Sequence, residues 1–284
     1  MQQSQVGDSD GFNTTVTCAP APRRLHDERI EAACFDAMIR SQYSDLAGEA
    51  LNMSRQVESY LGDGPPRTPS AIRLLVYQMG DIHGKNILDL GCGTGDLSII
   101  LAKRGARVTG IDVSSESINV ARRRTEVNHI SHLVSNEVMS AHCMTFPDAC
   151  FDFVAGKAIL HHLDLARSRD EIKRVLKKGG RGFFVEPIAL SRALRFLRKL
   201  VPIAEDKETP DERQLSAQDL ALFCSGFDAW TLKEVGLLSS RLERFFPRYP
   251  SWLVRLFRFD AWVLDHVPSL RKYADMVLII VRKD

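Results

Sequence analysis

Short apolar segments alternate with amphipathic segments through the middle of the chain. Five segments have the length and apolar content of strands: 86–91, 106–112, 132–139 (weakly), 151–156 and 181–187. Residues 96–104, 114–124 and 164–178 between them repeat their apolar positions at helical spacing. Alternation of this kind is typical of an α/β fold, in which a doubly wound, mostly parallel sheet is covered by helices on both faces.

The alternation stops after residue 187 and resumes only near the C-terminus. Residues 188–272 are expected to form an inserted helical cap over the active face, with one strand near 229–235. The run MVLIIVR (276–282) predicts a further strand, which brings the expected sheet to seven strands. Gly179-Gly180 are predicted to stop the helix over 164–178.

The N-terminal part divides into two regions by composition. Residues 1–24 are polar and rich in Pro, Ser and Thr, which predicts a disordered tail. Residues 25–83 are interpreted as a helical lid, because helical periodicity runs from Asp27 to about Gly62 and resumes at Ile72 after the loop GDGPPRTPS (62–70). Residues 84–284, including the cap at about 188–272, are then the main domain.

Composition and charge are ordinary and exclude several classes. The 284 residues include 44% hydrophobic and 26% charged residues, and the net charge of +2 gives no sign of a nucleic-acid partner. No run of about eighteen apolar residues predicts membrane insertion, and the N-terminus does not resemble a secretory signal. The six cysteines lack metal-ligand spacing, so a reduced, cytoplasmic protein without a bound metal is expected.

The stretch NILDLGCGTGD (86–96) places three glycines directly after a predicted strand. Gly91, Gly93 and Gly95 follow a G-x-G-x-G pattern, which differs from the G-x-G-x-x-G of dinucleotide sites. Asp96 at the opening of the next helix would repel a pyrophosphate but suits a zwitterionic amino acid. Asp112 ends the second strand, where its carboxylate can accept bonds from both hydroxyls of a ribose.

These residues resemble the cofactor site of class I (Rossmann-like) S-adenosylmethionine (SAM)-dependent methyltransferases. FPDACFDFVAGKAILHHLD (146–164) and RVLKKGGRGFFVEP (174–187) are similar to the fourth and fifth strand segments of that family. The loop KETPDERQL (207–215) loosely resembles small-molecule enzymes of the ubiquinone/menaquinone type. The resemblance implies a methyltransferase that uses SAM as its cofactor.

The resemblance also implies a set of cofactor residues. The methionine end of SAM falls to Asp89 and the glycine-rich turn, and the ribose to Asp112. The adenine position departs from the family pattern, because Ser140-Ala141 stand where Asp-Ala is usual, and a serine hydroxyl accepts the same bond more weakly. The full set of candidate cofactor residues is Tyr43, Asp89, Gly91, Cys92, Gly93, Gly95, Asp112, Val113, Ser140 and Ala141.

Candidate catalytic residues follow the fourth and fifth strands. His161 and His162 are adjacent, so at most one of them should face the ligand, and both can instead serve local hydrogen bonds. Glu186 can bind substrate, act as a base or hold the neighbouring loop. Tyr43 can cover the cofactor or belong to the core, and His142 is expected to be exposed.

The expected acceptor is a small, largely apolar molecule of specialised (secondary) or isoprenoid-type metabolism. Basic and aromatic residues recur in 191–203 and 243–259, which suits an acceptor with an anionic group, whereas their alternative role is to be a solvated face over a core. A cyclase or alkyl transferase would carry the same SAM motifs, and so would a non-catalytic SAM-binding subunit. The acceptor, the methylated atom and the oligomeric state are not encoded in recognisable motifs.

Overall fold

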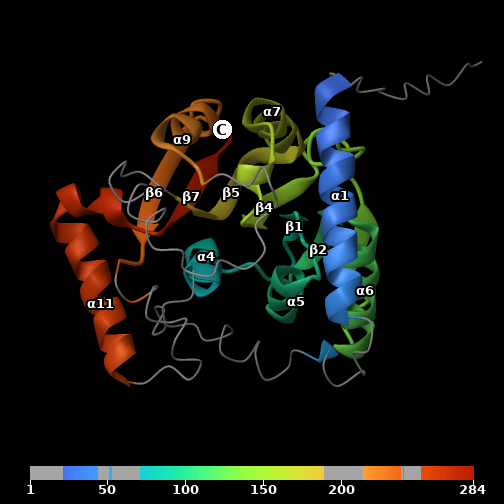
Figure 1. Ribbon diagram of the computed structural model, residues 1–284, viewed down its shortest axis with the longest axis horizontal. Helices are drawn as coiled ribbons and strands as arrows, with labels where there is room; N and C mark the ends of the chain where they lie inside the picture. Colours follow the sequence, from blue (N-terminus) through green and yellow to red (C-terminus); the bar gives the residue numbers. More distant parts are fainter. Residues whose placement is uncertain (1–21, 44–50, 53–70, 189–213, 238, 240–250) are drawn as a thin grey trace, which may run out of the picture.

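A seven-stranded sheet is the centre of the computed structural model (Figure 1). The structure describes residues 22–43, 51–52, 71–188, 214–237, 239 and 251–284. The strands are β1 (Asn86–Leu90), β2 (Arg107–Asp112), β3 (Val134–Val138), β4 (Phe151–Lys157), β5 (Leu176–Pro187), β6 (Ala229–Val235) and β7 (Met276–Arg282). Every strand expected from the sequence is therefore present.

The strand order is β3-β2-β1-β4-β5-β7-β6. The first five strands pair in parallel, whereas β7 runs antiparallel to both β5 and β6. The order reverses between β1 and β4, and the crevice beside their carboxyl ends is where open α/β sheets bind ligands. This arrangement confirms the predicted doubly wound, mostly parallel sheet.

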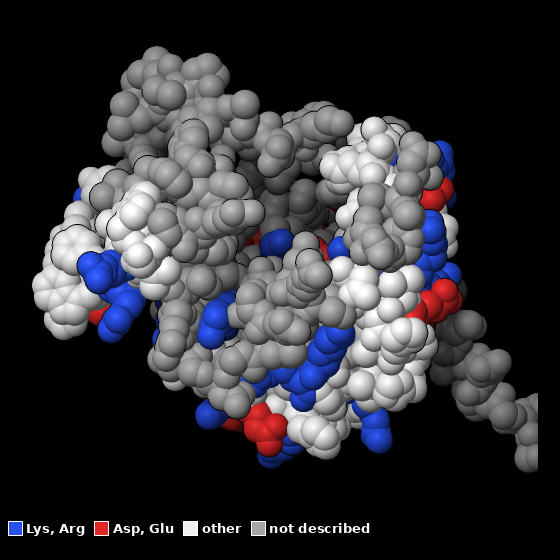
Figure 2. All heavy atoms as spheres, turned by 90° about the horizontal axis from the view of Figure 1, so that it is seen from below, with Lys and Arg blue, Asp and Glu red and all other residues white. Residues whose placement is uncertain are grey.

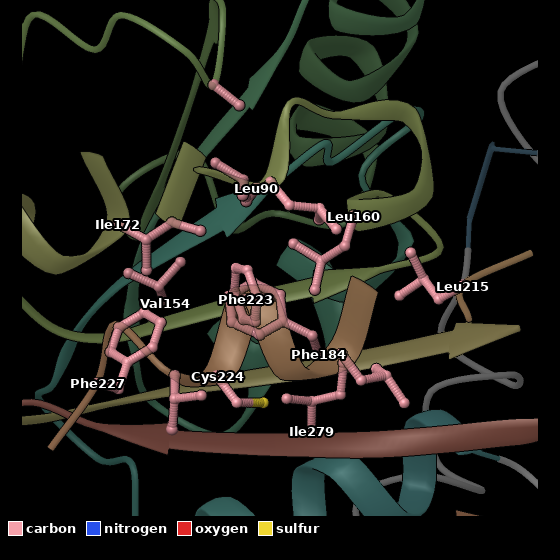
Figure 3. Close-up of a cluster of buried hydrophobic side chains, with 14 of the residues drawn as sticks. Leu90, Val154, Leu160, Ile172, Phe184, Leu215, Phe223, Cys224, Phe227 and Ile279 are labelled. Atoms are coloured by element: carbon pink, nitrogen blue, oxygen red, sulfur yellow. The ribbon is translucent and has the colours of Figure 1, made fainter. Parts of the chain in front are cut away.

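Helices cover both faces of the sheet. They are α1 (Pro22–Tyr43), α4 (Ala71–Met79), α5 (Asp96–Lys103), α6 (Ser115–Val127), α7 (Leu165–Val175), α9 (Ala217–Cys224) and α11 (Ser251–His266), with the short 3-10 turns η1 (Leu160–His162) and η2 (Pro268–Tyr273). The core on one face joins Leu90, Val154 and Phe184 of the sheet to Phe223 of α9 (Figure 3). The core on the other face includes Leu75 of α4.

Helix α7 ends three residues earlier than predicted. The sequence predicted a helix over 164–178 stopped by Gly179-Gly180, but α7 ends at Val175 and strand β5 begins at Leu176. The reason is the pairing of Leu176 with Phe151 of β4, which draws this segment into the sheet. Gly179, with φ of 76°, instead lets the strand turn while its N–H donates to the carbonyl of Lys283.

The two described helices of region 25–83 take different positions. Helix α1 lies beside α6, and residues from Glu28 to Tyr43 reach the carboxyl edge of the sheet (Figure 1). Helix α4 instead packs Leu75, Val76 and Met79 into the sheet core. Residues 1–21 of the predicted tail lie outside the described residues, and Pro22 to Arg24 belong to α1.

The described part of the cap lies away from α1. Helix α9 packs on α7, and α11 packs on β6 at the far edge of the sheet (Figure 1). Residues 189–213, 238 and 240–250 of the predicted cap lie outside the described residues. None of the described helices has the length and hydropathy needed to cross a bilayer.

Candidate functional site

A cavity of about 340 Å³ lies beyond the carboxyl ends of β1, β2 and β4. Its walls come from the turn after β1, the ends of β2 and β4, the segment after β3, and helix α1. The residues with ionisable side chains that line it include Glu28, Glu31, Asp89, Asp96, Asp112, Lys157 and His162. The apolar part includes Phe35, Met38, Ile39, Met139, Ile159 and Leu163. Such a mixture of apolar walls and a few polar groups is typical of small-molecule sites.

The glycine-rich turn forms the floor of this cavity. Gly91, Gly93 and Gly95 have φ values of 66°, 51° and 86°, a backbone region that side chains disfavour. A Cβ on Gly91 would also lie 2.4 Å from Cδ1 of Ile159, which follows β4. Gly91 therefore allows the turns after β1 and β4 to lie against each other.

The buried carboxylate of Asp89 and the half-buried one of Asp112 face the turn. Asp112 accepts hydrogen bonds from the backbone N–H groups of Gly93 and Ser114, each at 2.9 Å. Asp89 accepts one from the hydroxyl of Ser98 at 2.6 Å. Burial raises the pKa of Asp89 to about 7 and also raises the pKa of Asp112. Burial therefore disfavours the ionised form of both carboxylates, and a positively charged ligand would offset this electrostatic free energy.

Helix α1 closes one side of the cavity through Glu28. Its carboxylate accepts a hydrogen bond from the hydroxyl of Ser140 at 2.8 Å and contacts the ring of His142. The bond with His142 lowers the pKa of Glu28. His142 is buried, and its Nε2 accepts a hydrogen bond from the N–H of Asp164 at 2.8 Å. The expectation that His142 would be exposed was therefore wrong.

A second contact of α1 holds the histidine pair after β4. Nδ1 of His162 lies 2.6 Å from Oε1 of Glu31, and His162 lines the cavity. The ring of His161 lies 4.1 Å from that of His162 but points away, with Nδ1 2.7 Å from Oε2 of Glu186. The two rings therefore have different partners, and only His162 lines the cavity.

Glu186 is fully buried and holds the η1 turn. Its Oε1 accepts hydrogen bonds from the N–H groups of Ile159 and Leu160, both at 2.9 Å, while Oε2 pairs with His161. Glu186 has no exposed surface and does not line the cavity. In this structure its carboxylate thus fixes the loop that carries both histidines.

The structure brings most of the predicted cofactor residues to one cavity. Those that line it are Tyr43, Asp89, Gly91, Cys92, Gly93, Asp112, Val113 and Ala141, together with His162. The candidates that do not line the cavity are Gly95, Ser140, His161 and Glu186. Gly95 caps α5 and lies close to Ala121. Burial raises the pKa of the Cys92 thiol, which keeps it protonated.

Sequence reasoning missed three charged residues of the lining. Glu28 and Glu31 come from α1, which has almost no amphipathic pattern, so nothing in the sequence marks which side faces the cavity. Lys157 is the last residue of β4, in the same segment of chain as the histidine pair that follows this strand. Its place at the carboxyl end of a central strand was the signal that could have identified it.

The arginines proposed for an anionic acceptor are only partly described. Arg255 and Arg258 of α11 are exposed and do not line this cavity. Arg192, Arg195, Arg198, Arg244 and Arg248 lie outside the described residues. No group of three or more metal-ligating side chains occurs among the described residues.

Strand order and site location together define the class. A parallel sheet that ends in an antiparallel β7 between β5 and β6, with a G-x-G-x-G turn and an acidic β2 end at the switch point, is the class I SAM-dependent methyltransferase fold. Residues 88–184 match the family described as "Methyltransferase domain". Residues 88–184 are thus similar to a methyltransferase domain, and the fold around them is that of class I SAM-dependent enzymes.

Similar proteins support the same assignment. The chain is 31% identical to a ubiquinone biosynthesis O-methyltransferase of Photorhabdus laumondii over 57% of its length and 62% of the relative's. It is 38% identical to a demethylmenaquinone methyltransferase of Symbiobacterium thermophilum over 40% of its length and 47% of the relative's. The chain therefore spans about half to three fifths of these relatives.

A solved structure shares the fold. The YcgJ protein of Bacillus subtilis superposes with a TM-score of 0.53 at 19% identity, over 75% of this chain and 97% of that one. Identity at this level speaks for the fold alone.

Proposed function

We propose that this chain transfers the methyl group of SAM to a small, largely apolar acceptor of specialised or isoprenoid-type metabolism. The observation that carries the proposal is the cavity at the carboxyl edge, which α1 lines with Phe35, Met38 and Ile39. A helix of 22 residues, about 33 Å long, along that edge leaves room for a small molecule and obstructs a macromolecular acceptor.

In this proposal SAM lies along the ends of β1 and β2. Asp89 and the Gly91–Gly95 backbone hold its amino-acid end, and Asp112 holds the ribose hydroxyls. Three aspartates in the lining favour a ligand whose ammonium and sulfonium groups are positive. Glu28 supplies a carboxylate next to Ser140, so α1 restores the acid that position 140 lacks for the adenine amino group.

His162 is proposed as the base. When bound, SAM would supply an electrophilic methyl group, whose bonding electron pair would stay on sulfur as the acceptor bonds to the methyl carbon. A ring hydroxyl or activated ring carbon then loses a proton, which His162 can take because Glu31 orients its ring through Nδ1. Methyl transfer otherwise depends on alignment, since SAM itself supplies the activated group.

The relatives suggest the first acceptors to test. One is named for ubiquinone biosynthesis and the other for demethylmenaquinone, so quinol-type molecules come first. A phenolate would be a partly anionic acceptor, and Lys157 lies in the cavity wall beside the histidine pair to meet it. Glu186 and His161 are proposed to position His162 rather than to touch the acceptor.

Incubation of the purified chain with SAM and a panel of quinols, phenols and isoprenoid diphosphates, followed by mass spectrometry, tests the function. The proposal requires S-adenosylhomocysteine together with an acceptor that has gained one methyl group. An acceptor that rearranges without gaining a methyl group would identify a cyclase. Tight SAM binding without turnover of any acceptor would instead favour the non-catalytic subunit. A cytoplasmic location stays a prediction.

A further inference from the structure

The outward face of α11 has an unusual composition. The helix buries Leu253, Phe257, Asp260 and Leu264 against the rest of the protein. The opposite face carries Trp252, Arg255, Phe259, Trp262 and His266, which recur every three or four residues and are all exposed. We name these five residues the aromatic ridge. An ordinary surface helix places polar residues there, so the ridge reverses the expected pattern.

The rings of the ridge pack against one another. The centroids of Phe259 and Trp262 lie 6.1 Å apart and those of Trp262 and His266 4.7 Å apart, both in stacked arrangements. Phe259 is 57% and Trp262 53% exposed, so this stacking does not cover them. Large aromatic side chains held in order and open to solvent mark an interaction surface.

The charge around the ridge is positive. Arg255 belongs to the ridge and Arg258 lies beside it, and in the described part of the chain neither has a carboxylate partner. Of the acids of α11, Asp260 is buried and accepts hydrogen bonds from Ser239, which leaves Asp265 as the exposed one. On the left of Figure 2, on the side where α11 lies, an uncharged area borders Lys and Arg side chains, with an acidic side chain at its margin.

We propose that the aromatic ridge docks the protein onto the surface of an anionic lipid bilayer. Trp combines an apolar body with a polar N–H, which suits the boundary between headgroups and acyl chains. Arginines on the same face add attraction to anionic headgroups, while their aliphatic parts lie along the apolar layer. The helix would lie in the plane of the interface, as amphipathic surface helices do, without crossing the membrane.

A second copy of the chain fits the ridge less well. A twofold contact between two α11 helices would bring Arg255 and Arg258 of both copies together, with Asp265 alone to offset them. A helix of 16 residues is about 24 Å long. One face of such a helix falls short of the roughly 800 Å² per partner that a stable interface buries. Charge complementarity therefore favours the lipid surface.

Vesicle binding tests the proposal with the full chain. Co-sedimentation with phosphatidylcholine vesicles containing phosphatidylserine should retain the wild type, and binding should fall about tenfold or more for Phe259→Ser/Trp262→Ser. The variant Arg255→Gln/Arg258→Gln should lose binding to the anionic vesicles while keeping the weak binding to pure phosphatidylcholine. Both pairs are exposed, so unchanged SAM binding in calorimetry confirms that the variants fold.

Trp230→Ser is the matched control. Trp230 is 54% exposed, as Trp262 is, but it lies on strand β6. Its replacement should leave vesicle binding intact. Equal loss in the Trp230 control and the ridge variant would overturn the proposal, as would wild type that fails to bind anionic vesicles. The opposing outcome in sedimentation velocity is a wild type that is a dimer and a ridge variant that is a monomer. If the wild type also fails to bind vesicles, this result would assign the ridge to self-association and refute lipid docking.

Discussion

Nδ1 of His162 lies 2.6 Å from Oε1 of Glu31, so the turn after β4 and helix α1 meet at the wall of the cavity. The two residues are 131 positions apart in the sequence. This contact fixes one ring nitrogen of His162 and makes the orientation of the proposed base depend on the position of α1.

Glu31→Gln and His162→Ala should both lower turnover. Loss of the proposed base should reduce kcat by about 10²-fold or more, and loss of its orienting carboxylate by less. SAM affinity should change little, because neither side chain is assigned to the cofactor. Steady-state kinetics and calorimetry measure the two effects. His132→Ala, at an exposed histidine, is the control. Full activity in both site variants would remove His162 from the mechanism.

Asp112→Ala should weaken SAM binding by roughly 2–4 kcal/mol, because it removes charge-assisted hydrogen bonds to the ribose. The variant also frees the N–H of Gly93, which Asp112 holds at 2.9 Å, so part of the loss comes from the glycine turn. Isothermal titration calorimetry checks the value. Unchanged SAM affinity would exclude Asp112 from the ribose site, and a preference of the wild type for NAD would contradict the whole assignment.

SAM affinity should rise as the pH increases through about 7. Burial raises the pKa of Asp89 to about 7 in the ligand-free protein, and the ionised carboxylate is the form that attracts the ammonium group of SAM. Measurements of the Kd for SAM across this pH range should show the decrease in Kd in the wild type and a smaller pH dependence in Asp89→Asn. Identical pH profiles for the two proteins would mean that Asp89 does not titrate near the ligand.

The same group sets a trend in stability with the opposite sign. In the folded, ligand-free protein the pKa of Asp89 is above that of an unfolded aspartate, about 3.9, so the folded state retains a proton that the unfolded state has released. The stability from this group is complete below pH 4 and decreases as the pH rises to about 7. Asp89→Asn should reduce this decrease in denaturant titrations, and Asp112 contributes a smaller part in the same direction.

Gly91→Ala should destabilise the protein more than Gly93→Ala. Both glycines have positive φ values, so both variants carry backbone strain of about 1–2 kcal/mol. Only at Gly91 would the new Cβ collide with Ile159, while the space around Gly93 is open. Thermal unfolding of the two variants measures the difference, and Ile159→Val should recover part of the loss in Gly91→Ala. Equal melting temperatures would show that the turns relax apart.

Glu186→Ala should cost about 3–5 kcal/mol of folding free energy, since it removes the buried carboxylate that accepts hydrogen bonds from two backbone N–H groups and contacts His161. Glu186→Gln, which keeps one acceptor oxygen, should fold and lose turnover through the displaced histidine turn. Chemical denaturation and kinetics separate the two effects. Glu186→Gln with full stability and unaltered KM but no turnover would favour direct contact with the acceptor.

The sheet and the glycine turn were predictable because their signals are local. Apolar runs of strand length and the spacing of Gly91, Gly93 and Gly95 need no knowledge of the rest of the chain. The boundary between α7 and β5 was not predictable in this way, because the pairing of Leu176 with Phe151 overrides a local stop signal at Gly179. Pairing across 25 residues of sequence decided that segment, and no window of helical length contains it.

Two carboxylates of the site were predictable because strands carry them. Asp89 and Asp112 end β1 and β2, so their meeting follows from parallel pairing. Glu28 reaches Ser140 across 112 positions, and this long-range contact buries His142, whose neighbours in sequence are ordinary. The role of α1 depends on tertiary packing that its own weakly patterned sequence does not specify.

The position of β7 has a consequence for synthesis on the ribosome. β7 follows β6 in the sequence, yet it lies between β5 and β6 and holds β6 to the sheet through pairs from Ala229 to Val235. During synthesis the edge of β5 that pairs with β7 stays unpaired, and β6 cannot pair with the sheet until residues 276–282 have left the exit tunnel. Nascent chains that stall before residues 276–282 have emerged would expose the edge of β5 to other chains, so slow translation of the segment between β5 and β7 should promote aggregation.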